Sequence, residues 1–403
     1  MTVAFPSHLG NNPICFPNTP TNQLIEDLII SYIGDKSPTI NKEELLYSIH
    51  NSIPNEVLFN KVLFKAVKSI DFDIVFALIT AQKIDVNAVD ENSITALFYC
   101  CELNAYNIAK LLLQNGANVN FKDDLEDTPL MHAIVQSNAE MVKLIIFYDA
   151  LINDKNLQGT SALMYAASNL NFEKMKILID NGANVDDFDN KKITILMEAI
   201  VQMESNKKVS AIKILDLILD KTQNIDAQDN LGETALMKTK SVEIAEKLLD
   251  KKASLSIRNL EGQTPLLVAA KDCVYDLIDL YIARRADPSI IDKDGWTALM
   301  LAAHSYHSKP TIEKLLPYSA KIITYQNNMG LTALKIAVFN KNIAATTTLL
   351  QNGAFPESND KENMDVATRN FTNIAISEEI FQEGRTFRVS SNEQIIYYFG
   401  LMF

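Results

Sequence analysis

The chain of 403 residues holds only four cysteines, too few for a disulfide-built scaffold of this length. We therefore expect a reducing compartment. No apolar run reaches the roughly 18 residues that a membrane-spanning helix needs. The N-terminus also lacks a basic segment followed by an apolar core, the pattern of an ordinary signal peptide. We expect a cytoplasmic protein without a membrane span, and secretion by a route that needs no such peptide stays open.

Basic residues are scarce as well, with 37 Lys and Arg against 50 Asp and Glu and a net charge of −13. Nucleic acids and anionic membranes are bound through a basic face, so neither is an expected partner. The chain also lacks a glycine-rich phosphate loop, a Gly-x-Ser-x-Gly elbow and a His-Glu-x-x-His pair. We therefore expect no catalytic residue, no cofactor and no metal.

What the chain does contain is a repeated unit. Similar starts occur at Thr95, Thr128, Ser161 and Thr194, each 33 residues after the last. A fixed period of this length is typical of stacked repeats. A stack also explains how a chain too long for one ordinary core shows no domain break, because each repeat contacts only its neighbours.

Each unit predicts two helices and a connecting hairpin. A start such as Thr128-Pro129 suits a helix N-terminus, because the Thr oxygen can accept a bond from a free backbone N–H and Pro tolerates the first position. Apolar residues then recur at helical spacing. The second helix of one unit ends at Asn181-Gly182, where Gly can adopt a left-handed conformation. The polar segment that follows is rich in turn formers and predicts a hairpin-like loop.

This unit resembles the ankyrin repeat, whose signature is Thr-Pro-Leu-His-x-Ala. The resemblance runs from about Val62 to Ala367, with an Asp or Asn and a Gly before several starts, as at Asp229 and Gly232. It implies an all-α solenoid of nine to ten helix-turn-helix repeats with β-hairpin-like loops. The starts are Lys61, Thr95, Thr128, Ser161, Thr194, Thr234, Thr264, Thr297 and Thr332, with a degraded unit near Asp365.

The expected organisation has four parts. Residues 1–20 form an extended or disordered segment, and residues 21–55 a helical N-terminal cap with helices over 21–33 and 41–50. Residues 56–367 form the solenoid. Residues 368–403 hold a C-terminal cap, with a helix over 371–383, and an apolar tail. The tail, Ile395–Phe403, either covers the last repeat or docks to a partner.

Two repeats break the period. Repeat five spans 40 residues, with an insertion expected within Val201–Lys208 between its helices. Repeat six spans 30 residues and carries Thr239 and Lys240 where others have Ala-Ala, so we predict a locally weak joint. The usual His position of the family is mostly Met, as at Met131, and we expect apolar packing to replace the hydrogen bonds of that His.

Three groups of residues could suggest chemistry but receive structural interpretations. Cys100 and Cys101 occupy the small buried positions filled elsewhere by Ala pairs, so we interpret them as packing residues. His304 and His307 lack further ligands at metal-site spacing and are expected at a solvated helix end. The resemblance also raises hydroxylation of hairpin asparagines at Asn87 and Asn120, but we prefer a turn-forming role.

The resemblance implies a concave groove, formed by the hairpin tips and the first helices, that binds a protein. Apolar residues at the tips are unusual because a tip has little core to join, and Trp and Tyr are typical interface anchors. The candidate protein-binding residues are Tyr99, Leu125, His132, Leu157, Tyr165, Glu198, Leu231, Lys238, Leu260, Trp296, Leu301, Met329 and Leu331, with Val268 and Ile336 at equivalent helix positions.

The preferred function is a non-enzymatic scaffold, a monomer that binds a partner protein of unknown identity through this groove. One alternative is an enzyme or host-directed effector whose activity lies in the flanking segments. Another is a tether that docks through the apolar tail. Fold alone does not decide among these functions.

Overall fold

The computed structural model describes residues 31–32, 42–51, 56–82, 84–206, 212–305, 308–319 and 322–354. The chain divides into two compact units, Met1–Leu157 and Gln158–Phe403. Unit 1 contains α2 (Lys42–Asn51) and three helix pairs. These pairs are α3 (Glu56–Lys68) with α4 (Phe72–Thr80), α5 (Ala96–Glu102) with α6 (Tyr106–Gln114), and α7 (Pro129–Gln136) with α8 (Ala139–Phe147).

Unit 2 continues the same alternation of a first and a second helix in each repeat. Its first helices are α9 (Ala162–Ser168), α11 (Ile195–Asn206), α13 (Ala235–Lys238), α15 (Pro265–Lys271), α17 (Ala298–His304) and α19 (Ala333–Phe339). Its second helices are α10 (Phe172–Asp180), α12 (Ile212–Leu219), α14 (Val242–Asp250), α16 (Tyr275–Ala283), α18 (Lys309–Leu315), which runs into the 3-10 turn η2 (Leu316–Tyr318), and α20 (Ile343–Gln351).

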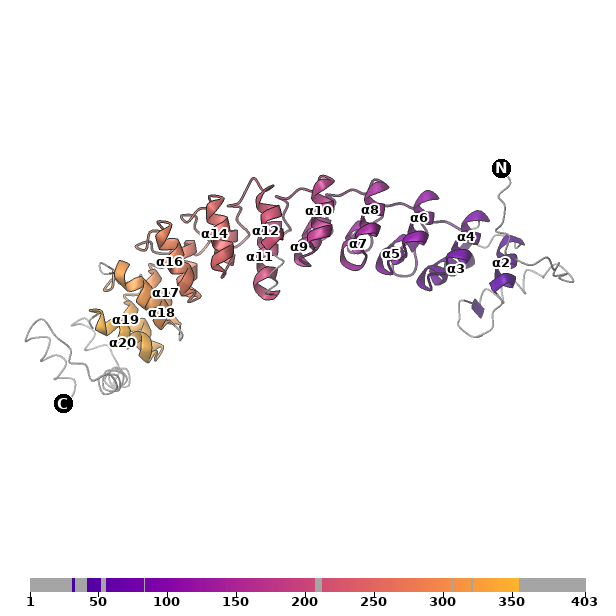
Figure 1. Cartoon of the computed structure of the whole chain (residues 1–403). Helices are drawn as coiled ribbons and strands as arrows, with labels where there is room; N and C mark the ends of the chain where they lie inside the picture. The colour runs from indigo at the N-terminus through magenta and orange to yellow at the C-terminus, as the bar shows by residue number, and fades with distance from the viewer. Residues whose placement is uncertain are drawn as a thin grey trace, which may run out of the picture. The chain divides into compact units, whose positions relative to one another are not determined.

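Within each unit, helices of the same kind stack on one another. In unit 1 the first helices α3, α5 and α7 contact in series, and the second helices α4, α6 and α8 form a parallel row (Figure 1). In unit 2 the series from α9 to α19 and from α10 to α20 are built in the same way. The predicted all-helical repeat stack is therefore confirmed. The described residues contain only isolated β-bridges, such as that between Val89 and Thr95.

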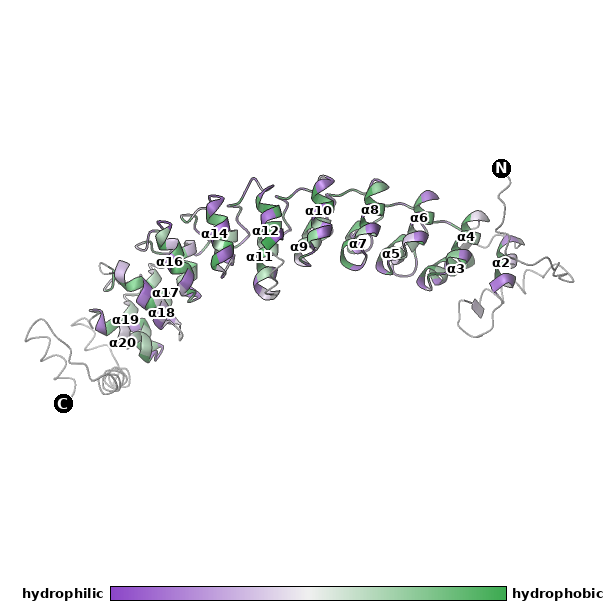
Figure 2. Cartoon of the chain, in the orientation of Figure 1, coloured by the Kyte–Doolittle hydropathy of each residue, from purple (hydrophilic) through white to green (hydrophobic). Residues whose placement is uncertain are grey.

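The core of each repeat is an apolar stripe on short helices. In α6, Ile108, Ala109, Leu112 and Leu113 are buried, following the spacing of one helix face. Most helices run for seven to nine residues, too short to be stable alone, so packing against neighbours supplies their stability. Figure 2 shows hydrophobic and hydrophilic stretches alternating within the helices, as one buried face requires.

The predicted hydroxyl caps are present at only some helix starts. The side chains of Thr128, Thr297 and Thr332 each accept a bond from the backbone N–H three residues later. The prediction is wrong for Thr95 and Thr234, whose buried hydroxyls have no hydrogen-bond partner among the described residues. There the third amide donates to the backbone carbonyl of the Thr instead, at 3.2 and 3.0 Å, so the helix starts without the side chain.

An Asp or Asn shapes seven of the hairpin tips. Asp229 Oδ1 accepts bonds from the backbone N–H groups two and four residues later, and its own N–H donates to the carbonyl of Glu233. The side chain thereby builds the turn that the family resemblance predicted from Asp and Gly residues. The same arrangement occurs at Asp90, Asp123, Asp189, Asn259, Asp292 and Asn327.

Substitutions at two glycines can show how tightly successive hairpins pack. Gly232 has φ +74, and a Cβ there would lie 2.9 Å from the backbone N of Leu260. Gly116 has φ +88 and open space around it. Urea unfolding followed by circular dichroism should show that Gly116→Ala costs about 1 kcal/mol for its left-handed backbone. Gly232→Ala should cost about 2 kcal/mol, because backbone must also move. Equal losses would show that the hairpins do not pack this closely.

The irregular repeats differ from the others in their first helices. Helix α11 has 12 residues, so part of the predicted insertion extends this helix through Asn206, and residues 207–211 lie outside the described part. Helix α13 has only four residues and ends at Lys238. The shortening of repeat six therefore falls on its first helix.

Several predictions concern residues that the structure does not describe. These are the segment 1–20, nearly all of the expected helix 21–33, His307, the degraded unit near Asp365, the helix over 371–383 and the tail 395–403. The other expected N-terminal helix, 41–50, corresponds to α2. In the ranges that are described, no helix is long and apolar enough to span a bilayer.

Candidate protein-binding surface

The hairpin tips place large apolar side chains in solvent. Leu125, Leu157, Leu231, Leu260 and Met329 are between 52% and 66% exposed. Two further tip residues, Trp296 and Leu331, are half-buried. The ring of Trp296 contacts that of His304 edge to face, with centroids 5.9 Å apart. The tips thus carry accessible apolar area of the kind that often marks an interaction surface.

Backbone hydrogen bonds join neighbouring tips within each unit. In unit 1 the N–H of Leu157 donates to the carbonyl of Leu125 at 3.0 Å. In unit 2 the N–H of Leu260 donates to the carbonyl of Leu231 at 2.9 Å. In each of these two cases the backbone of one tip is tied directly to the backbone of the next.

Several first-helix candidates already interact with other side chains of the protein, which the sequence did not predict. Tyr99 donates from its hydroxyl to Asp90 Oδ2 at 2.5 Å, and the Lys68 ammonium lies 4.2 Å from the centre of its ring. Burial alone would raise the pKa of Asp90. The bond from Tyr99, two backbone donors and the charge of Lys68 outweigh burial and lower that pKa below its ordinary value. The phenol therefore supports its own hairpin.

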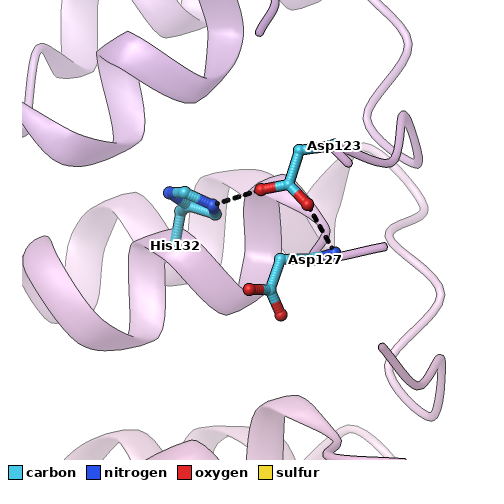
Figure 3. A group of neighbouring side chains, drawn as sticks. All are labelled: Asp123, Asp127 and His132. Atoms are coloured by element: carbon cyan, nitrogen blue, oxygen red, sulfur yellow. Dashed lines mark hydrogen bonds and ion pairs between the residues drawn. The ribbon is translucent and has the colours of Figure 1, made fainter. Parts of the chain in front are cut away.

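His132 is held in the same way between two carboxylates. Its Nε2 lies 3.1 Å from Asp123 Oδ2 (Figure 3). Its Nδ1 lies 3.3 Å from Glu102 Oε1. Asp123, Asp127 and His132 have donor atoms within 4.8 Å of one another, a spacing that could hold a metal. Carboxylate oxygens of both aspartates already accept hydrogen bonds within the protein, however. Asp123 Oδ1 accepts two bonds from backbone N–H groups, and Asp127 Oδ1 accepts one from the side-chain amide of Asn156. The group is best described as a hydrogen-bonded brace of the hairpin.

Lys238 repeats the pattern in unit 2. Its ammonium lies 2.7 Å from Asp229 Oδ2 and 2.8 Å from Glu233 Oε2. Burial alone would lower the pKa of Lys238, but the bonds to these two carboxylates raise it above its ordinary value. The ammonium is charged at neutral pH, and the two carboxylates of its own hairpin balance that charge.

A shared spacing links these three pairs and could have been found in the sequence. The tip carboxylate precedes its first-helix partner by nine residues at Asp90 and Tyr99, at Asp123 and His132, and at Asp229 and Lys238. The hairpin turns back on the helix that it precedes, so this spacing brings the two side chains together.

The expectation for Leu301 is wrong. This side chain is only 8% exposed, and the equivalent Ile336 is 3% exposed. Helices α15, α17 and α19 pack side by side and place Val268, Leu301 and Ile336 at the same register. Leu301 and Ile336 are therefore buried within the stack, and Val268 is half-buried. Tyr165 and Glu198 are half-buried, and Glu198 accepts a bond from Gln202 at 3.1 Å.

The remaining sequence candidates have structural roles. Cys100 and Cys101 are free thiols with no exposed surface, as their packing interpretation predicts, and burial raises the pKa of both. The Asn87 side chain donates to the Gly116 carbonyl and accepts from the Asn118 N–H in the next repeat. Asn120 bridges to Asp149 and Leu151 in the same manner.

Comparison with known proteins agrees with this architecture. A family model described as ankyrin repeats, with three copies, matches residues 63–156, 147–229 and 268–360, more than half of the chain. The chain is also similar to Ankyrin repeat and ELMO domain-containing protein D of Dictyostelium discoideum. Their identity is 28%, over 25% of this chain and 12% of that protein.

A second, shorter similarity is to Palmitoyltransferase akr1 of Schizosaccharomyces pombe. It is 45% identical over 14% of this chain and 9% of that protein. The chain thus spans only about a tenth of the length of these curated relatives. The match to the transferase covers too little to carry its activity over to this chain.

Proposed function

Because the chain belongs to the ankyrin-repeat family, whose repeats generally mediate protein–protein interaction and are typically non-catalytic, we propose that it is a binding scaffold. Its partner protein would contact the hairpin tips and the first-helix side of the repeats. The exposed tip residues carry this proposal, namely Leu125 and Leu157 in unit 1 and Leu231, Leu260 and Met329 in unit 2. Exposed apolar side chains on hydrogen-bonded hairpin tips suit a surface that a partner covers.

The test compares two variants that each replace four exposed apolar residues with Asp. The tip variant changes Leu125, Leu157, Leu231 and Leu260. The control variant changes similarly exposed residues at ends of helices, namely Phe147, Phe172, Tyr275 and Phe339. Each purified chain is used to capture proteins from cell lysate, after circular dichroism has shown unchanged helix content.

We expect the native chain and the control variant to capture the same partner and the tip variant to lose it. A partner that survives the tip substitutions, or that is lost only from the control variant, would contradict binding through the tips. Such a result would move attention to residues 207–211 or to the C-terminal segment.

A further inference from the structure

We propose that the tip face of unit 1 binds a lysine- or arginine-rich segment of a partner protein that carries apolar side chains. This tip face comprises the hairpin residues 88–94, 121–127 and 154–157. The inference rests on the proposed function and names the chemistry of its partner. The tip face of unit 1 contains seven acidic residues and two lysines, Lys122 and Lys155. The acidic residues are Asp90, Glu91, Asp123, Asp124, Glu126, Asp127 and Asp154.

The acidic residues divide into a structural and an available group. Asp90, Asp123 and Asp127 are largely buried and engaged in the hydrogen bonds that build the hairpins. Glu91 and Asp124 are exposed, and neither side chain has a partner among the described residues. Since desolvated or unpaired carboxylates attract cations, these two are the primary contacts for basic side chains.

Glu126 and Asp154 add to this negative surface. The single ammonium of Lys122 lies 3.7 Å from a carboxylate oxygen of each, so one positive charge is shared by two negative charges. Lys122 also donates to the Lys155 carbonyl at 3.2 Å. The group therefore keeps a negative excess, and its lysine is already held in place.

Apolar contact is available beside the charge. Leu125 stands between Asp124 and Glu126 and is 54% exposed, and Leu157 is 52% exposed on the next tip. The backbone bond between these two leucines fixes adjacent repeats side by side. Packed helices lie about 10 Å apart, a distance that an extended chain covers in about three residues. A segment with apolar residues three apart and basic residues around them fits both features.

The rest of the chain does not offer this occupant. Residues 355–403 contain eight acidic and four basic residues, and residues 1–41 contain three acidic residues and one lysine. Neither segment complements an acidic face. The five corresponding hairpins of unit 2 carry seven acidic and four basic residues, including Lys191 and Lys192, so the acidic excess per hairpin is a property of unit 1. We therefore assign the basic segment to a partner protein.

The experiment measures binding of the fluorescent octapeptide Lys-Lys-Leu-Lys-Lys-Leu-Lys-Lys by polarisation. The full chain is compared with the tip variant Glu91→Lys, Asp124→Lys, Glu126→Lys. A matched control, Asp73→Lys, Glu140→Lys, Asp149→Lys, makes the same change in net charge at exposed positions away from the tip face. Circular dichroism shows that all three chains are folded.

We expect the tip variant to weaken peptide binding at least tenfold and the control to weaken it no more than twofold. Replacing both peptide leucines with serine should weaken binding to the native chain at least threefold, and raising the salt should weaken it further. Equal weakening in both variants would overturn the proposal, because the peptide would then respond only to net charge. No binding to the native chain would overturn it as well.

Sedimentation velocity on the same samples separates a second copy of the chain from a basic partner. A dimer that only the tip variant dissociates would identify the occupant as a second copy and overturn the proposal. The scaffold function is judged separately. If the leucine substitutions at the tips abolish partner capture from lysate while the octapeptide fails to bind, the scaffold stands and the basic partner is wrong.

Discussion

Replacing Tyr281 with alanine is expected to lower the free energy of unfolding by about 3–5 kcal/mol, the cost of removing a large aromatic side chain from a packed core. Tyr281 lies in α16 and is 1% exposed. Its hydroxyl donates to the Leu236 carbonyl in α13 at 3.1 Å, across 45 residues of sequence. Burial and the nearby charge of Glu204 raise the pKa of Tyr281 well above its ordinary value, so the hydroxyl remains a donor.

The bond from Tyr281 replaces one that the short helix cannot make. In a continuing helix the Leu236 carbonyl would accept from the N–H of Lys240, four residues later. Helix α13 ends at Lys238, so this carbonyl would otherwise be buried without a donor. Tyr281→Phe keeps the ring and removes only the donor, and should cost about 1–2 kcal/mol.

Urea unfolding followed by circular dichroism measures both losses. Tyr275→Ala is the control, because Tyr275 lies in the same helix but is 43% exposed, and its loss should stay within about 1 kcal/mol. Since a repeat stack can unfold in parts, amide exchange in α13 and α14 should be measured as well. A Tyr281→Ala loss no larger than that of Tyr275→Ala would contradict the assigned role.

Replacing Glu204 with alanine is expected to cost about 2–3 kcal/mol, because several donors lose a charged acceptor at once. Glu204 lies near the C-terminal end of α11, in the part that the insertion adds to this helix. Its Oε1 accepts from the Thr239 hydroxyl at 2.7 Å and from the N–H groups of Lys240 and Ser241 at 2.9 Å each. The Lys240 N–H is the other half of the helical bond that α13 lacks. The expected loss of stability is modest because Glu204 is only half-buried, so water reaches part of this site.

Two comparisons isolate the contribution of Glu204. Glu204→Gln retains an acceptor oxygen and should lose less than half as much as the alanine variant. Glu198→Ala removes a carboxylate from the same helix whose side-chain partner, Gln202, is also in α11, and should cost about 0.5 kcal/mol. The readouts are urea unfolding and the exchange rate of the Lys240 and Ser241 amides. Unchanged exchange in Glu204→Ala would refute this assignment.

The same two residues show where sequence interpretation stops. The positions of the insertion in repeat five and of the deletion in repeat six follow from counting between Thr194, Thr234 and Thr264, and the structure places both in first helices. That Glu204 and Tyr281 bridge the deletion does not follow, because each acts 35 to 45 residues away across irregular repeats. The predicted weak joint stays a prediction, which the variants above test.

The binding surface was predictable in outline for a related reason. Tip exposure follows from the register of the repeat, so Leu125, Leu231 and Leu260 could be named from the sequence. Burial of Leu301 depends on how α17 packs against α15 and α19, the first helices of the two neighbouring repeats. The pairing of Lys68 with Tyr99, and of Glu102 with His132, depends on side-chain conformations between repeats. The sequence pattern of a single repeat does not contain information about these contacts between repeats.

Four of the side chains that join successive repeats act in the same direction along the chain. Asn87, Asn120, Asp186 and Asp226 each accept a bond from backbone of the repeat that follows. During synthesis at about 5–20 residues per second, the N-terminal repeats leave the ribosome first. Each new repeat then emerges some seconds later beside acceptors that are already in position. The chain can add repeats in the order of translation, with each folded hairpin serving as the template for the next.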